Sequence, residues 1–184
     1  IDSSGTWQWA YSASGSGDEI GFGVVSDDNG SILVTGEYQT GSITFGSTTM
    51  TNSGGIDIFV AKVTSGGWSW AENATGNASD KAFDIAIDSS GSAYITGIFY
   101  SYTLTFGSCC NLTSPGPPAN QWTGPDSAAF VAKISSSGTW QWAQESSGEP
   151  GSLNSEDIAI DSSDNVYIVG SMWGSYTFGN TTLS

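Results

Sequence analysis

Carboxylates are the side chains in this sequence with the most scope for chemistry. The 184 residues include 18 Asp and Glu and three lysines, with no arginine and no histidine. A serine or cysteine nucleophile usually needs a histidine base, and zinc sites usually contain His or clustered Cys ligands. Two carboxylates facing each other across a cleft at ~5–10 Å would suffice for glycoside hydrolysis. The acids lie mainly in repeated turn positions, so we predict that the protein is not an enzyme and keep a glycosidase as the third alternative.

The acidic turns are the candidate metal sites. Their oxygens could gather around Ca²⁺, but the turns lack the spacing and the regular bidentate Glu of a complete calcium loop. Asp, Asn, Ser and Gly are also preferred in hairpin turns for steric reasons alone. We therefore predict no metal and no cofactor, with calcium as the alternative. The turns are Asp-Asp-Asn-Gly at 27–30, Asp-Ser-Ser-Gly at 88–91 and Asp-Ser-Ser-Asp-Asn at 161–165.

The charge of the chain narrows the classes of partner. A formal net charge of −15 argues against nucleic acid, because phosphate binding needs clustered Lys and Arg, and equally against anionic membrane surfaces. No apolar run approaches the length of a transmembrane helix, and no signal peptide is present. The opening residues 1–5 resemble the middle of a repeat, so we expect a mature or excised portion of a longer precursor.

Five Asn-x-Ser/Thr triplets indicate a secreted glycoprotein. All five lie in segments whose composition predicts turns or loops, which are the usual acceptor positions in proteins outside the cell. The alternative is compositional accident in a chain rich in Ser, Thr and Asn. We expect an extracellular protein, secreted or at the cell surface, with covalent glycans. The acceptor residues are Asn29, Asn73, Asn77, Asn111 and Asn180.

The two cysteines, Cys109 and Cys110, are adjacent. This is not the framework of a small disulfide-rich domain. Neighbouring residues in a strand point to opposite faces, and a bond between adjacent cysteines demands a particular geometry. A vicinal disulfide and free or externally paired thiols both remain open.

Self-similarity along the chain points to the elements that must position these groups. Four motifs recur in the same order, which defines a repeat of roughly 60–70 residues. They are an aromatic motif at 6–10, 67–71 and 139–143; a hairpin segment at 22–36, 83–97 and 156–170; Thr-Phe-Gly at 44–46, 105–107 and 177–179; and Phe-Val-Ala-Lys at 59–62 and 130–133.

Within one unit the apolar residues alternate with a period of two, as in β-strands. Residues 84–88 and 92–96 predict two strands joined by a Ser-Ser-Gly turn, and 128–134 and 139–143 predict two more. Four short antiparallel strands joined by tight turns describe a propeller blade. We predict an all-β fold of tandem four-stranded antiparallel blade repeats, β-propeller-like, and either open or completed by a neighbouring chain.

The linked motifs resemble the SBBP type of blade repeat. The resemblance rests on the hairpin Asp88-Ser-Ser-Gly-Ser-Ala-Tyr-Ile-Thr-Gly97 together with Phe-Val-Ala-Lys at 59–62 and 130–133, and it covers essentially the whole chain. It implies a β-propeller module of large secreted or surface proteins, mostly without assigned activity. The chain departs from the pattern in its Trp-x-Trp segments and in holding too few units for a closed ring.

The units predict where the chain is incomplete. Residues 1–67 form a first repeat, 68–138 a second with a loop insertion at 108–127, and 139–184 a third that lacks its Phe-Val-Ala-Lys strand. Closed propellers typically have 4–8 blades, so we expect an open end. An unpaired sheet edge invites strand addition from another chain, and head-to-tail contacts of that kind make rings or filaments.

The tryptophans offer both packing and binding. Residues two apart on a strand share a face, so the repeated pairs should pack between blades, where each indole buries a large apolar area; stacking on sugar rings is the alternative. Trp122 and Trp173 fall outside the pairs and are the candidate ligand contacts. The pairs are Trp7 and Trp9, Trp68 and Trp70, and Trp140 and Trp142.

Two functional hypotheses follow from these patterns. The first is a non-catalytic structural protein, glycosylated and self-associating into a surface layer or filament, without nucleic acid and without membrane insertion. The second is an adhesin-like module that recognises glycans or proteins through loops such as 108–127. An exposed cluster of Trp122 and Trp173 would favour binding, whereas aromatics buried at an exchange of strands between chains would favour assembly.

Overall fold

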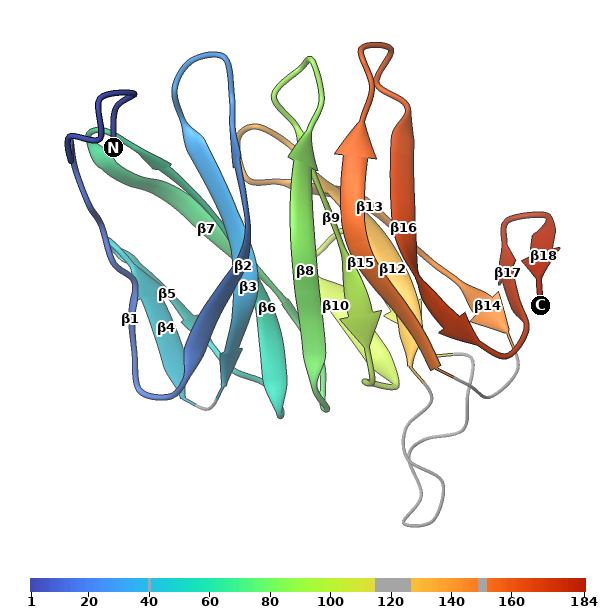
Figure 1. Cartoon of the computed structure of the whole chain (residues 1–184). Helices are drawn as coiled ribbons and strands as arrows, with labels where there is room; N and C mark the ends of the chain where they lie inside the picture. Colours follow the sequence, from blue (N-terminus) through green and yellow to red (C-terminus); the bar gives the residue numbers. More distant parts are fainter. Residues whose placement is uncertain (40, 115–126, 149–151) are drawn as a thin grey trace.

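The chain folds into antiparallel β-sheets that stand side by side in chain order (Figure 1). The computed structural model describes residues 1–39, 41–114, 127–148 and 152–184. Within these ranges the regular structure consists of strands, as the period-two pattern predicted. None of these described residues forms a helix long and apolar enough to cross a membrane.

Each of the first two units is a four-stranded antiparallel sheet built in meander order. The first unit uses β2, β3, β6 and β7, and the second uses β8, β9, β12 and β13. Their bounds are β2 Glu19–Ser26, β3 Ile32–Gln39, β6 Ile56–Thr64, β7 Gly67–Thr75, β8 Asp80–Ile87, β9 Ala93–Phe99, β12 Ala128–Ile134 and β13 Trp140–Glu145.

A small hairpin that the sequence did not predict interrupts each unit after its second strand. The Thr-Phe-Gly motif forms the hairpin turn, where the glycines at 46, 107 and 179 have φ of +61°, +52° and +59°. Glycine adopts this left-handed backbone at no steric cost. The hairpins are β4 Ser42–Phe45 with β5 Thr48–Thr51, β10 Thr103–Phe106 with β11 Cys110–Thr113, and β17 Tyr176–Phe178 with β18 Thr181–Leu183.

These hairpins join each unit to the one before it. The end of β7 pairs with β10 of the second unit, at Thr75 with Thr105 and Ala74 with Phe106. Two short strands repeat the joint elsewhere: β1 (Ser14–Gly15) pairs with β4, and β14 (Ser147–Gly148) pairs with β17. The segment that precedes each of the three units therefore pairs with the hairpin of that unit.

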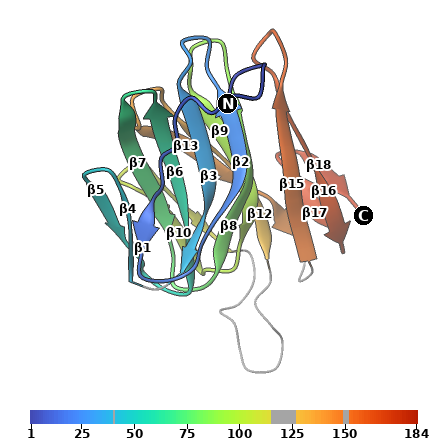
Figure 2. The same ribbon diagram turned by 60° about the vertical axis from the view of Figure 1, so that its left-hand side comes forward.

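The third unit stops after two strands, β15 (Ser152–Ile160) and β16 (Val166–Trp173), and its hairpin. The first strands β2, β8 and β15 lie side by side, and Figure 2 shows β15 and β16 at the end of the row opposite β4 and β5. The predicted fold class is confirmed: blade-like four-stranded repeats in an open array that does not close on itself.

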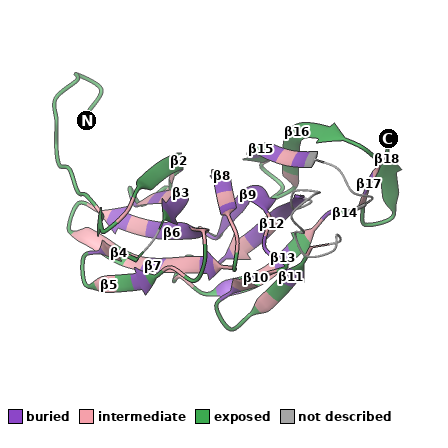
Figure 3. Ribbon diagram, turned by 90° about the horizontal axis from the view of Figure 1, so that it is seen from below, coloured by how far each residue is buried: buried purple, intermediate pink, exposed green. Residues whose placement is uncertain are grey.

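Burial follows the position of a unit in this row (Figure 3). The largest apolar cluster lies between the first and second units, where Leu33 and Ile58 pack with Ile95 and Phe106. At the two ends, by contrast, Val24 on β2 is 68% exposed and Val169 on β16 is 60% exposed. Apolar residues are thus buried where one unit covers another, and they are exposed to solvent at the two ends of the row, where a neighbouring unit is absent from the described structure.

The prediction that the two tryptophans of a pair share a face is wrong. Trp68 packs with Phe45 on the side of the preceding unit, whereas Trp70 packs into the cluster shared with the second unit. The cause is a β-bulge, because Lys62 pairs with Trp70 while the next residue pairs with Trp68. One extra residue in a strand turns its neighbours to opposite faces, so Trp68 and Trp70 make contacts on opposite sides of their own unit.

Candidate functional site

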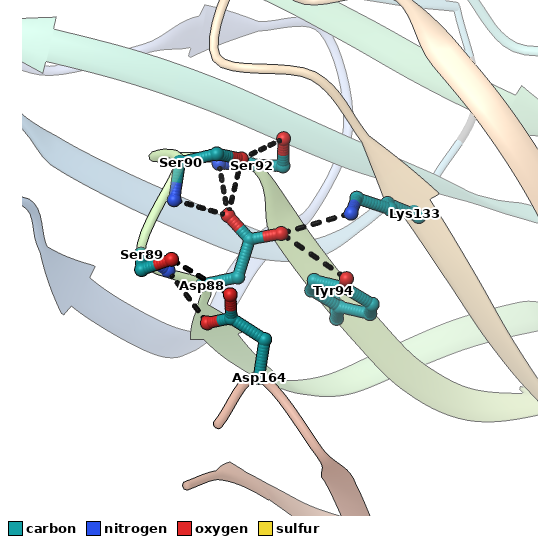
Figure 4. Close-up of polar contacts among 7 residues, drawn as sticks. All are labelled: Asp88, Ser89, Ser90, Ser92, Tyr94, Lys133 and Asp164. Atoms are coloured by element: carbon teal, nitrogen blue, oxygen red, sulfur yellow. Dashed lines mark hydrogen bonds and ion pairs between the residues drawn. The ribbon is translucent and has the colours of Figure 1, made fainter. Parts of the chain in front are cut away.

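The hairpin turn of the second unit shows how the acidic turns are used (Figure 4). Asp88 Oδ1 accepts hydrogen bonds from the backbone N–H groups of Ser90 and Ser92 at 2.9 and 3.0 Å. Its Oδ2 accepts from the Tyr94 hydroxyl at 3.1 Å and forms an ion pair with Lys133 at 2.8 Å. The carboxylate therefore closes its own turn and binds the third strand of the unit through the lysine.

Electrostatics supports this ion pair. Burial opposes the ionisation of Asp88, but Lys133 and the hydrogen bonds from Ser90 and Ser92 outweigh it and hold the pKa of the carboxyl well below its usual range. For Lys133, burial likewise opposes the charge, while Asp88 raises the pKa of the ammonium. The ammonium also lies 4.7 Å from the centre of the Tyr94 ring, a favourable position for a cation.

The first unit repeats the arrangement, and the third unit repeats half of it. Asp27 pairs with Lys62 at 3.0 Å, and its pKa falls to about 2 because Lys62 and the turn overcome the effect of burial. Asp161 closes its turn in the same way and accepts from the Tyr167 hydroxyl at 3.0 Å. No lysine reaches it, since the three lysines pair with Asp27, Glu37 and Asp88.

A groove of about 660 Å³ lies along β16, where the first two units hold their third strands. Its lining is mainly apolar and includes Phe130, Leu153, Ile168, Met172 and Phe178. We call it the β16 groove. It lies at the end of the array formed by the described residues.

In each of the first two units a hairpin phenylalanine contacts two further aromatic rings, but at the β16 groove the hairpin phenylalanine makes neither contact. In the second unit Phe106 contacts Phe130 and Trp140, with ring centres 5.7 and 5.0 Å apart. Phe45 makes the same two contacts in the first unit, at 5.1 and 4.7 Å. Their counterpart in the third unit, Phe178, is 42% exposed. It lacks the ring of a third strand and the indole of a fourth.

The first tryptophan of each pair also forms a bond between units. The indole N–H of Trp68 donates to the carbonyl of Ser12 at 3.2 Å, and that of Trp140 donates to the carbonyl of Asn73 at 3.2 Å. Ser12 and Asn73 occupy the same repeat position in the preceding outer strand. The equivalent indole at the start of the chain, Trp7, is 77% exposed. The indole hydrogen bond between units is therefore formed by Trp68 and Trp140 but not by Trp7.

Four of the five predicted glycan acceptors are exposed, namely Asn29, Asn77, Asn111 and Asn180. Two of the five are not in turns, because Asn73 lies in β7 and Asn111 in β11. Asn73 is half-buried and donates to the hydroxyl of the buried Tyr38 at 2.9 Å. Its partial burial and this hydrogen bond make Asn73 a poor acceptor.

The remaining predicted sites are scattered. Cys109 and Cys110 are joined in a disulfide at the turn of the second hairpin. Trp173 is 78% exposed at the end of β16, whereas Trp122, together with most of the loop insertion, lies outside the described residues.

The second tryptophans of two repeated pairs contact tyrosines. Trp142 packs against Tyr94 with ring centres 5.7 Å apart, and Trp9 lies beside Tyr11. Asp164, which the sequence placed in the third acidic turn, accepts from Ser89 N–H and Oγ at 2.9 and 2.7 Å, a link between two turns that was not predicted.

The acids offer no assembled metal centre in the described ranges, where no three His, Cys, Asp or Glu side chains gather to hold an ion. One pair of carboxylates does approach: Asp84 and Asp157, on neighbouring first strands, accept from the same N–H of Ile158 at 3.0 and 2.9 Å. Burial and the neighbouring Asp157 raise the pKa of Asp84. Neither carboxylate lines the β16 groove.

Two fully buried carboxylates lie near the joint between the first two units. Asp57 accepts from the backbone N–H groups of Ser53 and Gly76 at 2.6 and 3.0 Å. Asp80 accepts from the N–H and Oγ of Ser101 at 3.0 and 2.6 Å. Burial raises the pKa of both, that of Asp80 to about 6, with the charge of Asp57 adding to the effect.

Replacing Asp80 by asparagine should remove part of the pH dependence of stability. The pKa of Asp80 is raised from its ordinary value of 3.8 to about 6, so the unfolded chain releases this proton first and stability falls as pH rises between those values. The loss amounts to at most about 3 kcal/mol. Urea titrations from pH 3.5 to 7 measure the free energy of unfolding of both proteins. Between pH 3.8 and 6 the Asp80→Asn variant should become more stable relative to the natural chain. A difference in stability that does not change with pH would contradict the raised pKa of Asp80.

The comparisons with known proteins agree with this architecture. No curated protein matches the chain. Residues 141–181 match the family model described as SBBP, Beta-propeller repeat, a span that runs from β13 through β15 and β16 into the last hairpin. The same strands and motifs occur in the units before it. Residues 141–181 thus match an SBBP beta-propeller repeat, as the resemblance of the hairpin segment indicated, while both Phe-Val-Ala-Lys copies lie outside the matched span.

Proposed function

We propose that the chain is a non-catalytic, extracellular structural protein that assembles head to tail through its two open ends. The observation that carries this proposal is their complementarity. Among the described residues, the third unit has two strands and its hairpin, while residues 6–10 have the sequence of a fourth strand and lie exposed. A second copy placed by the internal repeat would bring its residues 6–10 to the third unit.

The internal joints specify the contacts that such a pair of chains would make. Trp68 and Trp140 each pack on the hairpin phenylalanine of their own unit and donate to the outer strand of the preceding one. By the same rule, Trp7 of one copy would pack on Phe178 of the next and donate to its Glu145 carbonyl. Both aromatic side chains are exposed in the single chain, so their burial would favour association.

Sedimentation velocity over a concentration series tests this proposal. We expect species larger than one chain, and we expect Trp7→Ala and Phe178→Ala each to shift the distribution toward single chains. Tyr102→Ala serves as the matched control, because Tyr102 is 51% exposed but lies in the middle unit. A natural chain that stays monomeric at every concentration, or a control that acts like the two end variants, would refute end-to-end assembly.

We further propose that the exposed sequons carry glycans that keep the outer surface soluble. Expression through a secretory pathway that glycosylates asparagine should modify exposed acceptors such as Asn77 while leaving Asn73 bare, because the Asn73 amide is bonded to Tyr38. Peptide mapping by mass spectrometry before and after enzymatic deglycosylation measures this. Full occupancy of Asn73 would show that β7 is less well formed than described.

A binding module remains the second candidate, favoured by one observation. Trp173 is 78% exposed, and exposed indoles stack readily on sugar rings or partner side chains. On this alternative, a glycan array should give hits that Trp173→Ala abolishes, and chain association should be unaffected by Trp7→Ala. The first proposal predicts the opposite pair of results.

A further inference from the structure

We propose that the Cys109–Cys110 disulfide is a thiol–disulfide exchange site, which holds the hairpin of the second unit in one register and releases it when a dithiol reduces the bond. The site lies between β10 (Thr103–Phe106) and β11 (Cys110–Thr113), in the middle of the three units. The proposal is therefore independent of the open ends of the array and of the assembly proposed above.

The turn of this hairpin is one residue longer than the turns of its two counterparts. In the first unit Phe45 pairs with Thr48, so two residues form the turn, and the hairpin of the third unit has the same spacing. In the second unit Phe106 pairs with Cys110, so three residues form the turn. The last of them is Cys109, whose N–H donates to the carbonyl of Phe106 at 3.1 Å. The disulfide therefore joins the extra residue to the first residue of β11.

The extra residue keeps the apolar side chain of β11 on the buried face. Leu112 pairs with Leu104, and both are buried, as Met50 pairs with Ile43 in the first unit. A two-residue turn in this hairpin would shift β11 by one position and place Asn111 opposite Leu104. Because side chains alternate along a strand, the shift would turn Leu112 to the outer face. The hairpin thus has two registers that differ by one residue.

The disulfide is compatible with only one of these registers. In the shifted register Cys109 would become a residue of β11 and pair with Phe106. Both cysteines would then be neighbours in a regular strand, where their side chains point to opposite faces and their sulfur atoms cannot reach bonding distance. Oxidation therefore excludes the shifted register, and reduction permits it.

The two cysteines differ in their access to a reductant. Cys109 is exposed, whereas Cys110 is half-buried and packs against the apolar cluster between the first two units. A thiolate of the dithiol therefore attacks the sulfur of Cys109, forms a mixed disulfide with it and releases Cys110 as the leaving thiolate. The second thiol of the dithiol then displaces Cys109. The dithiol ends as a disulfide, and its two electrons and two protons leave both cysteines as thiols.

Reduction should act on β11 and leave the joint between the units in place. β10 carries contacts with the neighbouring strands, because it pairs with β7 and its Phe106 packs against Phe130 and Trp140. From β11, the N–H of Thr113 donates to Glu145 Oε2 at 2.8 Å. A shift of β11 by one residue moves Thr113 away from this acceptor while β10 keeps its place. The expected change is therefore local to β11.

The test combines alkylation with hydrogen exchange on the purified chain, with dithiothreitol as the dithiol. We expect iodoacetamide to modify neither cysteine of the oxidised chain, and to modify both once dithiothreitol is added without denaturant; mass spectrometry counts the modified residues. Amide exchange in the segment 108–113 should then become about tenfold faster or more, because local opening of β11 is no longer restricted to one register. The matching segment 47–51 of the first hairpin contains no cysteine and should exchange at an unchanged rate.

A chain that carries both Cys109→Ser and Cys110→Ser is the matched control. Its segment 108–113 should exchange at the faster rate with or without dithiothreitol. Alkylation of both cysteines before any reductant is added, or reduction that requires denaturant, would overturn the proposal. So would unchanged exchange of segment 108–113 after reduction, or equal acceleration of both hairpins. The measurements on the natural chain decide the matter even if the double variant does not fold.

Discussion

Trp140→Ala is expected to lower the free energy of unfolding by about 3–5 kcal/mol, whereas Trp7→Ala should change it by less than about 0.5 kcal/mol. The two tryptophans occupy the same position of the same motif. Trp140 is 6% exposed, packs on Phe106 and donates its indole N–H to Asn73. Trp7 is 77% exposed, so its removal leaves no cavity.

Urea unfolding at a concentration low enough to keep the chains apart measures both effects without interference from association. Trp140→Phe is the companion variant, since it keeps an aromatic ring while losing the indole hydrogen bond, and it should cost less than the alanine. A loss at Trp7 comparable to that at Trp140 would mean that Trp7 is buried within the single chain, against the described structure.

Gly97→Ala is the second substitution with a large expected effect, a loss of about 3 kcal/mol or more. Gly97 lies opposite the bulge of β8, where an added Cβ would overlap the carbonyl oxygen of Lys81 and lie 2.9 Å from the Cα of Ala82. Both obstacles are backbone atoms of β8, so neither can move aside as a flexible side chain would. The substitution should therefore distort the sheet of the second unit.

Gly21→Ala is the matched control. Gly21 lies at the equivalent of Ala82 in the repeat, and an added Cβ would meet nothing within 4 Å. We expect no loss and a gain of up to about 1 kcal/mol, because alanine restricts the unfolded chain. Thermal unfolding of the two variants side by side measures the contrast; similar stabilities would show that the bulge yields easily.

The sequence predicted the repeat, the strand type and the open end because these follow from local patterns. Alternation of apolar residues marks strands, and a motif that recurs in order marks a repeat. The absence of a third Phe-Val-Ala-Lys copy after residue 133 likewise predicted an incomplete third unit. Residues 84–88 and 92–96 proved to lie within, or to overlap, β8 and β9.

Features that depend on pairing between strands could not be predicted in this way. The bulge that sends Trp68 and Trp70 to opposite sides is set by the register against β6, and register is not visible in a single strand. The hairpin at Thr-Phe-Gly was missed because its strands have only four residues or fewer. The bond from Asn73 to Tyr38 joins residues 35 positions apart, which no local pattern reports.

The acidic turns also combine contacts that could be predicted from neighbouring residues with contacts to residues far along the chain that could not. Their sequence predicted that Asp88 stabilises a turn, and the bonds from Ser90 and Ser92 do this. The lysine that completes the arrangement comes from 45 residues further along the chain at Lys133 (133 − 88 = 45). Comparing units in three dimensions was therefore needed to recognise that Asp161 lacks a partner.

The central claim is that neighbouring copies continue the internal array from end to end. Cryo-electron microscopy of the purified chain at a concentration where it associates tests this most directly. We expect density in which β2 of one copy lies beside β15 of the next, as β8 lies beside β2 within the chain, with Trp7 packed on Phe178. Single chains with both ends bare, or copies joined through their sides with β16 exposed, would contradict it.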